Sequence, residues 1–343
     1  MTNPTILALL GICLLISCKL PAQVQTIEKE FIFEDAPFKE CHASSVLPQK
    51  NGEIIATWFG GEYERHPNVA IWVSRKINGT WTFPERVADG KINDTLSYPT
   101  WNPVLFQLTK DTVALYYKEG PSPQEWWGKY MLSSDGGQSW SAPISLPDGI
   151  LGPIKNKPIY TKEGTLLAPS SVEYGESWKA HIELSDDHGK TWEKALIDPQ
   201  GPYDVIQPSI LTHKDGRLQV LCRSKQNKIM TAWSDDNGRT WSALQPTEVL
   251  NPNSGTDAVT LQNGKHLLVY NPNVAGKNWW EGRNILKLAT SDDGLHWKDL
   301  CTLEEEESGE FSYPAIVQSE DEAIHITYTW NRKKIKYVKI RVD

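Results

Sequence analysis

The chain contains little methionine and cysteine, and after its first twenty residues it has no long apolar run. Its 343 residues include 3 Met and 5 Cys. Cys13 and Cys18 fall near the N-terminus, and Cys41, Cys222 and Cys301 are odd in number, without the spacing of metal ligands. This pattern supports neither a disulfide framework nor a cysteine-rich zinc site. Without a second run of about 20 apolar residues, the rest of the chain predicts no membrane-spanning helix.

An excess of basic charge is also absent. Lys and Arg total 35 against 43 Asp and Glu, which gives a net charge of −8. Nucleic-acid binding needs basic surface for the phosphates, so we expect no nucleic-acid partner. The composition, with 39% hydrophobic and 23% charged residues, is typical of a globular protein rather than a disordered one. An acidic ligand would require a local cationic pocket.

The N-terminal residues 1–22 carry an apolar run from Ile6 to Ser17 that is too short to span a membrane and is typical of an export signal. We therefore expect the mature protein in the periplasm or at the cell surface, as a monomer. The stretch Leu15–Cys18 is similar to a lipobox, in which Cys18 becomes the lipid anchor to the outer membrane. The alternative is simple cleavage after Ala22.

One short motif repeats along the chain. Its four good copies carry Ser, Asp, Gly and Trp, and they are Ser134–Trp140, Ser185–Trp192, Ser234–Trp241 and Ser291–Trp297; a degenerate copy runs from Ser74 to Trp81. Asp accepts backbone N–H bonds in such a turn, Gly takes a positive φ, and Trp packs between neighbouring sheets. The five Trp are separated by 59, 52, 49 and 56 residues.

This spacing predicts about six units, each long enough for a four-stranded blade. Short alternating runs bounded by Gly, Pro and Asn indicate strands throughout, and no long helical period is present. We therefore expect an all-β fold, with residues 25–343 forming one six-bladed β-propeller of four-stranded antiparallel blades. The last three strands, Tyr313–Gln318, Ala323–Trp330 and Ile335–Val342, are one short of a blade, and Gln25–Phe33 can supply the fourth.

A second repeat marks the first strand of each unit, which starts with a polar residue followed by Ala or Pro and then apolar residues. The six polar positions are His42, Asn102, Lys157, Gln207, Asp257 and Tyr313. In a propeller the first strand of each blade lines the central axis, so these side chains should form a ring around the mouth of the channel. Polar residues at all six positions favour a ligand site there.

The repeated turn is identified as the Asp-box, and its repetition over almost the whole mature chain resembles the sialidase superfamily of six-bladed propellers. The resemblance implies three Arg that clamp a substrate carboxylate, a Tyr nucleophile paired with a Glu, and an Asp acid/base. Tyr313 matches the nucleophile, and Arg223 and Arg283 match the second and third Arg. Asp-boxes are folding elements, so activity has to be read from the site.

Three of the six elements implied by the resemblance are changed. The stretch that should carry the first Arg reads Glu40-Cys41-His42-Ala43, the Glu falls on Gln207, and the Asp falls on Asn68. With Gln at 207, no base lies beside Tyr313 to make it a nucleophile.

Two Arg can still hold a carboxylate and thereby acidify the adjacent carbon. We therefore predict β-elimination, by a dehydratase or lyase, at a terminal uronic acid of an acidic oligosaccharide, with His42 and Tyr313 as base and acid. His66 and His181 are alternative bases. A sialidase-type hydrolase and a non-catalytic glycan-binding propeller are the alternative functions.

Further candidates complete the expected substrate-binding set of Arg223, Arg283, Lys157, Gln207, Asn102, Asp257, Asn68 and Trp127. Lys155 and Lys157 could bind anionic substituents, or simply be solvated, and Trp126 and Trp127 could stack on a sugar face. Arg223 and Arg283 could instead pair with Asp257 and Glu173. The scheme needs no metal and no cofactor.

Overall fold

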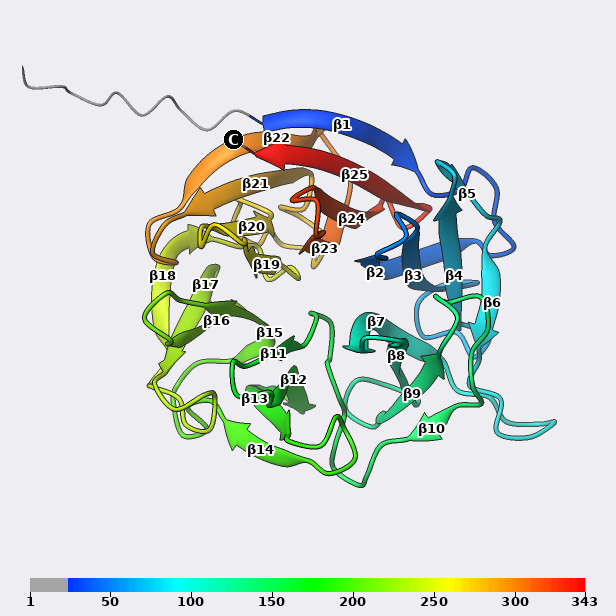
Figure 1. Cartoon of the computed structure of the whole chain (residues 1–343), viewed down its shortest axis with the longest axis horizontal. Coiled ribbons are helices and arrows are strands. Elements are labelled where there is room, and N and C mark those ends of the chain that lie inside the picture. The colour runs from blue at the N-terminus through cyan, green and yellow to red at the C-terminus, as the bar shows by residue number, and fades with distance from the viewer. Residues whose placement is uncertain (1–23, 343) are drawn as a thin grey trace, which may run out of the picture.

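The computed structural model describes residues 24–342, and the expected export signal, with Cys18, lies outside them. The described residues form 25 strands in six antiparallel sheets, which are arranged as blades around a central axis (Figure 1). Within residues 24–342 no helix is present that could cross a membrane. The predicted all-β, six-bladed propeller is confirmed.

Blades 1 to 3 follow one another along the chain. Blade 1 contains β2 (Glu40–Pro48), β3 (Ile54–Gly61), β4 (Ala70–Ile77) and β5 (Thr80–Trp81), with β6 (Glu85–Ala88) also paired to β4. Blade 2 contains β7 (Thr100–Thr109), β8 (Thr112–Glu119), β9 (Trp127–Ser133) and β10 (Ile144–Ser145). Blade 3 contains β11 (Ile159–Tyr160), β12 (Leu166–Tyr174), β13 (Ser177–Ser185) and β14 (Glu193–Leu196).

Blades 4 to 6 complete the ring. Blade 4 contains β15 (Val205–Thr212), β16 (Leu218–Ser224), β17 (Lys228–Ser234) and β18 (Gln245–Leu250). Blade 5 contains β19 (Asp257–Thr260), β20 (His266–Tyr270), β21 (Ile285–Ser291) and β22 (Lys298–Glu305). Blade 6 contains β23 (Phe311–Gln318), β24 (Ile324–Trp330), β25 (Lys334–Val342) and β1 (Val24–Phe31).

The ring closes through the first and last strands. β1 pairs antiparallel with β25, from Val24 opposite Val342 to Phe31 opposite Lys336, and Figure 1 shows β1 on the outer edge of that blade. The predicted contribution of the N-terminal strand to the last blade is confirmed. Closure in this way joins the two ends of the described chain in one sheet.

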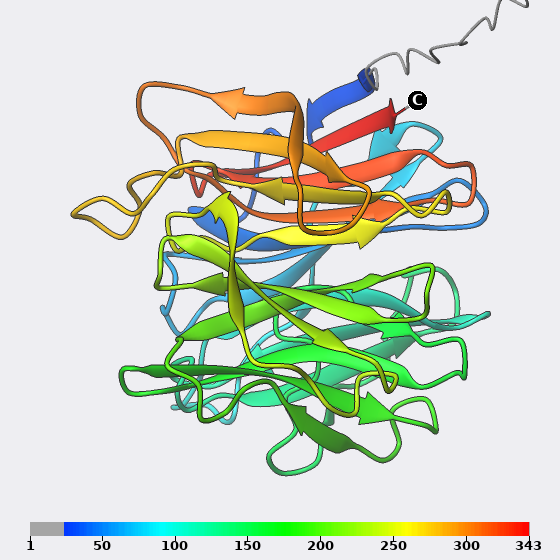
Figure 2. The ribbon, with the colours of Figure 1, turned by 90° about the vertical axis from the view of Figure 1, so that its left-hand side faces the viewer.

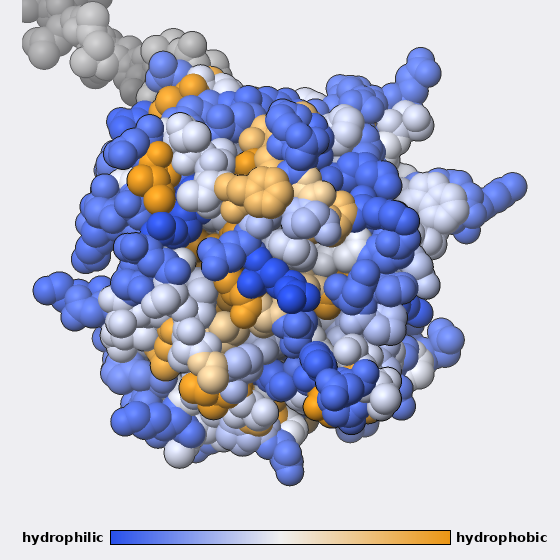
Figure 3. Space-filling model, turned by 90° about the vertical axis from the view of Figure 1, so that its right-hand side faces the viewer, coloured by the Kyte–Doolittle hydropathy of each residue, from blue (hydrophilic) through white to orange (hydrophobic). Residues whose placement is uncertain are grey.

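The repeated turns have the hydrogen bonds that the sequence predicts. In the turn after β17, Ser234 Oγ accepts from Gly238 N at 2.9 Å, and Asp236 Oδ1 accepts from Thr240 N at 2.8 Å. Trp241 Nε1 donates to the Gly238 carbonyl at 3.0 Å, and its ring packs against the apolar core that blades 3 and 4 share. Each such turn therefore ties a blade to its neighbour. The side of the molecule seen in Figure 3 is covered mainly by hydrophilic side chains.

Four of the innermost strands begin with a β-bulge. The strand register shifts between His42 and Ser45, Trp101 and Val104, Ile206 and Ser209, and Ser312 and Ala315. In each bulge one non-glycine residue has a left-handed backbone: Ala43 (φ 55°), Asn102 (41°), Gln207 (56°) and Tyr313 (51°). Such a conformation costs on the order of 1–3 kcal/mol and is common at functional sites.

The bulges correct one position of the predicted ring. In blade 1 the residue equivalent to Asn102, Gln207 and Tyr313 is Ala43, one residue after the predicted His42. The pattern of a polar residue followed by Ala or Pro marked His42, which precedes the left-handed position of blade 1 instead of occupying it. β11 and β19 have no such register shift, and Lys157 and Asp257 lie at the beginning of those two blades.

Candidate active site

Tyr313 lies at the centre of a cluster of polar side chains at the bulged ends of the innermost strands. Its phenol oxygen receives a hydrogen bond from Arg223 Nη1 at 2.7 Å and another from Gln207 Nε2 at 3.2 Å. Arg223 Nη1 also lies 3.4 Å from Gln207 Oε1. Both protein partners of the phenol oxygen are therefore donors, and they stabilise negative charge on it.

Arg223 is held without a carboxylate partner. Its Nε donates to Asn253 Oδ1 at 2.8 Å, and its guanidinium carbon lies 5.3 Å from the centre of the Trp178 ring. Among residues 24–342, no carboxylate forms an ion pair with Arg223 within 4.0 Å, so the alternative pairing with Asp257 or Glu173 is not seen. Glu173 lies nearby, and burial raises its pKa, an effect that Arg223 opposes.

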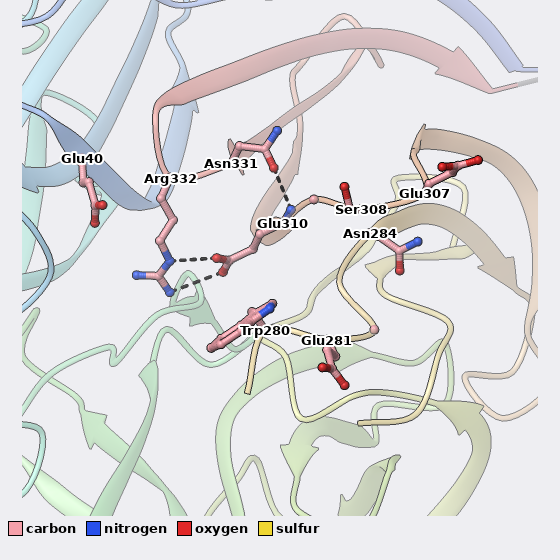
Figure 4. Close-up of a pocket in the computed structure, with 11 residues that line it drawn as sticks. Glu40, Trp280, Glu281, Asn284, Glu307, Ser308, Glu310, Asn331 and Arg332 are labelled. Atoms are coloured by element: carbon pink, nitrogen blue, oxygen red, sulfur yellow. Dashed lines mark hydrogen bonds and ion pairs between the residues drawn. The ribbon is translucent and has the colours of Figure 1, made fainter. Parts of the chain in front are cut away.

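Two further arginines, Arg283 and Arg332, share one buried carboxylate. Arg283 Nη1 lies 3.1 Å from Glu310 Oε1, and Arg332 Nε lies 2.8 Å from Glu310 Oε2. Arg332 also pairs with Glu64. Figure 4 shows Glu310 and Arg332 pointing toward one another from neighbouring loops. The two guanidinium groups outweigh the effect of burial and hold the pKa of Glu310 below its usual value.

Arg332 is the functional candidate that the sequence did not reveal. It follows β24 in a turn where Asn331 and Arg332 both have a left-handed backbone, at φ 51° and 53°. Neither the Asp-box spacing nor the pattern at the strand starts marks this turn. The structure thus brings three arginines together, of which the sequence predicted Arg223 and Arg283.

Trp279 covers two of these arginines. Its ring centre lies 5.1 Å from the guanidinium carbon of Arg283 and 4.7 Å from that of Arg332. Trp279 belongs to the β20–β21 connection, which extends outward from the body of the propeller in Figure 2. A hollow of about 420 Å³ adjoins the same cluster and is lined by Trp280, Asn284, Glu310 and Arg332, among others (Figure 4).

His42 is buried against the ring of Tyr313. Its side chain is only 1% exposed, and its ring centre is 4.2 Å from that of Tyr313. Its Nε2 is 3.5 Å from Arg332 Nη2, and its buried Nδ1 has no partner in the described structure. Burial, and then the nearby arginines, hold the pKa of His42 well below its ordinary value. The imidazole is thus neutral near pH 7. That His42 itself transfers a proton remains a prediction.

Lys157 and Asp257, which the sequence placed in the ring, bond each other. Lys157 Nζ lies 3.0 Å from both carboxylate oxygens of Asp257, and Asp257 Oδ2 accepts from the Ile316 backbone N–H at 2.9 Å. Lys157 also lines a separate hollow of about 790 Å³ together with Leu47 and Phe106. This pair holds blades 3, 5 and 6 together, and its contacts do not include the three arginines.

The remaining predicted residues, within residues 24–342, have no hydrogen bond or ring contact with Tyr313 or with the three arginines. Asn102 has the left-handed position of blade 2, equivalent to that of Tyr313. Asn68 Oδ1 accepts from Glu62 N at 3.0 Å and lies 2.7 Å from His66 Nδ1, so both side chains fix their own loop. Trp127 is 36% exposed at the start of β9, and its ring packs edge-on against Tyr98.

His181, an alternative base, lies in a buried network of its own. Its Nε2 is 3.0 Å from Glu183 Oε1, and Glu183 also accepts from the backbone N–H groups of Leu151 and Gly152. Within residues 24–342 no group of three or more His, Cys, Asp or Glu side chains is arranged to hold a metal ion.

Comparison with known proteins gives the same architecture. A sialidase of Bacteroides fragilis (strain YCH46) is 24% identical over 214 residues, which cover 57% of this chain and 38% of that protein. The chain thus spans less than half of that relative's length. A crystal structure of a protein of unknown function from Dyadobacter fermentans superposes with a TM-score of 0.75 at 18% identity, covering 93% of this chain and 99% of that one.

Solved sialidase structures share the fold at lower identity. The NanB sialidase of Streptococcus pneumoniae has a TM-score of 0.70 at 12% identity, covering 91% of this chain and 70% of that one. The intramolecular trans-sialidase of Ruminococcus gnavus has a TM-score of 0.69 at 14% identity, covering 92% and 98%. The BNR repeat-like domain family matches residues 52–326. The chain therefore belongs to the BNR repeat-like domain family, and its six-bladed fold is similar to that of sialidases.

Proposed function

We propose that this protein is an exported enzyme that removes a proton from the carbon beside the carboxylate of a terminal uronic acid and eliminates the group on the next carbon. Its kinship with sialidases supports a glycan-acting protein at the level of the superfamily. The observation that carries the finer proposal is Tyr313, whose oxygen has two donors and, in the part of the chain that the structure describes, no bond to a carboxylate. The N-terminal apolar run supports export.

The three arginines supply the site for the sugar carboxylate. Arg223, Arg283 and Arg332 gather around Tyr313 and His42, and among residues 24–342 only Glu310 and Glu64 form ion pairs with them. Their remaining positive charge favours an anionic ligand. When the proton leaves the carbon beside a bound carboxylate, the developing enolate charge falls on the oxygens that these guanidinium groups hold.

Tyr313 is the proton-transfer group in this scheme. In this scheme the oxygen of Tyr313, once deprotonated, takes the proton from C5 while Arg223 Nη1 stays bonded to it, and the electrons of the C5–H bond form the C4=C5 double bond. The C4–O bond then breaks with its electron pair, and the phenol returns the proton to the departing oxygen. The products are an unsaturated uronate and either water or a free sugar hydroxyl, and Tyr313 regains its starting form.

His42 supports Tyr313 from behind. The neutral imidazole packs on the phenol ring at 4.2 Å and is too buried to meet a sugar before another side chain moves. We therefore propose that His42 orients the Tyr313 ring, in place of the proton transfer that the sequence predicted for it. A neutral ring in this place adds no further cation to the three arginines.

Hydrolysis is the second candidate, and it is favoured by the similarity to sialidases. In that reaction Tyr313 would attack the anomeric carbon of a keto-acid sugar. The Glu that the resemblance places beside such a nucleophile is replaced by Gln207, an amide that lies 3.2 Å from the phenol oxygen.

The test incubates the purified protein with oligosaccharides that end in a uronic acid and, separately, with sialylated oligosaccharides. Ultraviolet absorbance reports a conjugated unsaturated uronate, and chromatography reports released sugars. Ultraviolet absorbance with no cleavage of the oligosaccharide identifies a dehydratase. Ultraviolet absorbance together with a released sugar identifies a lyase. A free saturated acidic sugar identifies a hydrolase and contradicts the proposal, as does binding without any product.

A further inference from the structure

The bulges that place Tyr313 and Gln207 also leave backbone carbonyl groups without strand partners. The register between β23 and β24 skips Tyr313 and Pro314, and the register between β15 and β16 skips Gln207 and Pro208. Buried carbonyl groups need hydrogen-bond donors, since an unpaired buried polar group costs free energy. Two neighbouring side chains from blade 3 supply these donors.

Lys155 bonds to blades 5 and 6. The side chain is 5% exposed, and its Nζ donates to the Thr256 carbonyl at 3.0 Å and to the Pro314 carbonyl at 2.5 Å. A third bond, of 2.7 Å, goes to Asn156 Oδ1. Burial lowers the pKa of Lys155 to about 7. In the charged form all three hydrogens of the ammonium group are used within the protein, and one of them holds the residue next to Tyr313.

Asn156 bonds to blade 4. Its Nδ2 donates to the Gln207 carbonyl at 2.9 Å and lies 3.2 Å from the Pro208 carbonyl and 2.8 Å from Ser209 Oγ. Its Oδ1 accepts from Lys155, so the two side chains form one unit, which we call the Lys155–Asn156 bridge. This bridge joins blade 3 to the bulges that carry Gln207 and Tyr313.

The same groups pack around Gly255. A Cβ atom at this position would lie 3.1 Å from Lys155 Cε, 3.2 Å from Tyr313 Cδ2 and 3.3 Å from Gln207 Oε1. The ammonium group also lies 5.8 Å from the centre of the Tyr313 ring. A methyl group added at position 255 would therefore press on all three side chains at once.

We propose that Lys155 is a positioning residue for the reaction, which acts with Asn156 to fix the Tyr313 phenol and the Gln207 amide against Arg223. This inference rests on the proposed function of Tyr313. The bridge touches the backbone of the bulges, and its hydrogen bonds do not involve Arg283 or Arg332. Its loss should therefore misplace the proton-transfer group while leaving those two arginines in position.

The first test compares Lys155→Met with Lys162→Met, an exposed lysine of the same blade, on a uronate-terminated oligosaccharide. A displacement of the reacting group by about 1 Å can cost roughly 100-fold in rate. We expect kcat of Lys155→Met to fall by about 10- to 100-fold, with KM changed far less, and Lys162→Met to match the wild type. A Lys155→Met enzyme with wild-type kcat, including one in which only KM rises, would overturn the inference.

Gly255→Ala tests the same unit by adding a methyl group between Lys155, Tyr313 and Gln207 without removing a polar group. It should lower kcat in the same direction, and it decides the matter if Lys155→Met does not fold. If the wild type turns over none of the oligosaccharides, the proposed function has failed, and the crystal structure of Gly255→Ala or Lys155→Met decides the positioning. A Tyr313 oxygen moved away from Arg223 supports the inference, and an unmoved one overturns it.

Discussion

Arg223 Nη1 donates a hydrogen bond to the Tyr313 phenol oxygen at 2.7 Å. Gln207 Nε2 donates to the same oxygen, so the groups bound to it stabilise negative charge. The resemblance implies a Glu beside a nucleophilic tyrosine, and within the described residues no carboxylate bonds to this phenol. The pair therefore favours proton transfer by Tyr313 over attack on a sugar carbon.

Tyr313→Phe should greatly slow turnover and leave substrate binding nearly unchanged. Removal of a general acid/base typically costs between about 100- and 10,000-fold in rate, and we expect kcat to fall within that range. The arginines remain in place, so the affinity for glucuronate, measured by calorimetry, should change by less than about threefold, or roughly 0.6 kcal/mol. A variant that keeps a tenth or more of wild-type kcat would show that another group moves the proton.

Arg332→Met should weaken carboxylate binding. Hydrogen bonds to charged groups contribute about 1.5–3 kcal/mol, so the Kd for glucuronate should rise by about 10- to 100-fold. The control is Lys333→Met, whose side chain is 59% exposed and pairs with Glu40 only at 3.9 Å. Equal affinity of Arg332→Met and the wild type would remove Arg332 from the binding site.

Gln207→Glu separates the two candidate reactions. A carboxylate at this position would lie close to Arg223, whose Nη1 is 3.4 Å from Gln207 Oε1, and would neutralise it. Elimination should therefore fall by at least about tenfold, the equivalent of 1.4 kcal/mol in the barrier. A variant that instead releases free sialic acid faster than the wild type would favour the hydrolase.

Asp236→Ala should lower stability without changing kcat. The carboxylate of Asp236 accepts from the backbone N–H and the hydroxyl of Thr240, and its loss leaves the turn after β17 without these bonds. We expect the free energy of unfolding to fall by about 1–3 kcal/mol in urea titrations. Asp235→Ala, at the exposed neighbouring position, should leave both quantities unchanged. Equal stability of the two variants would show that the motif is dispensable in this blade.

Stability should fall as the pH drops below about 6.5. Burial lowers the pKa of His266 and of His325 to about 4, and that of His42 well below its ordinary value. Between pH 6.5 and 4 the unfolded chain therefore binds more protons than the folded chain, and each histidine contributes about 1.4 kcal/mol per pH unit.

Urea unfolding at several pH values measures this slope, which should approach about 4 kcal/mol per pH unit for the three residues together. His325→Gln should reduce the slope by about a third. A free energy of unfolding that is constant from pH 7 to 5 would contradict the burial of these neutral rings.

The propeller could be predicted from the sequence because its repeats are local. Each Asp-box turn is fixed by residues within eight positions of one another, and the spacing of Trp81, Trp140, Trp192, Trp241 and Trp297 sets the size of a blade. The pairing of β1 with β25 followed from counting strands. These features depend on backbone hydrogen bonds and apolar periodicity, which short segments specify.

The site could be predicted only in part, because it depends on contacts between distant segments. Tyr313, Arg223 and Gln207 followed from the strand starts and the family resemblance, and they do lie together. In blade 1 the left-handed position of the bulge is Ala43 and not the predicted His42. A pattern of polar residues could not mark this position, because alanine is apolar. Arg332 is held in position by ion pairs with Glu310 and Glu64, which are 22 and 268 residues away in the chain.

The most direct measurement uses an oligosaccharide whose terminal uronic acid carries deuterium at C5, beside the carboxylate. After incubation with the wild-type enzyme, mass spectrometry gives the deuterium content of the product. Elimination through Tyr313 predicts an unsaturated uronate that has lost the deuterium, formed more slowly than from the unlabelled substrate. A saturated product that keeps the deuterium would contradict the account.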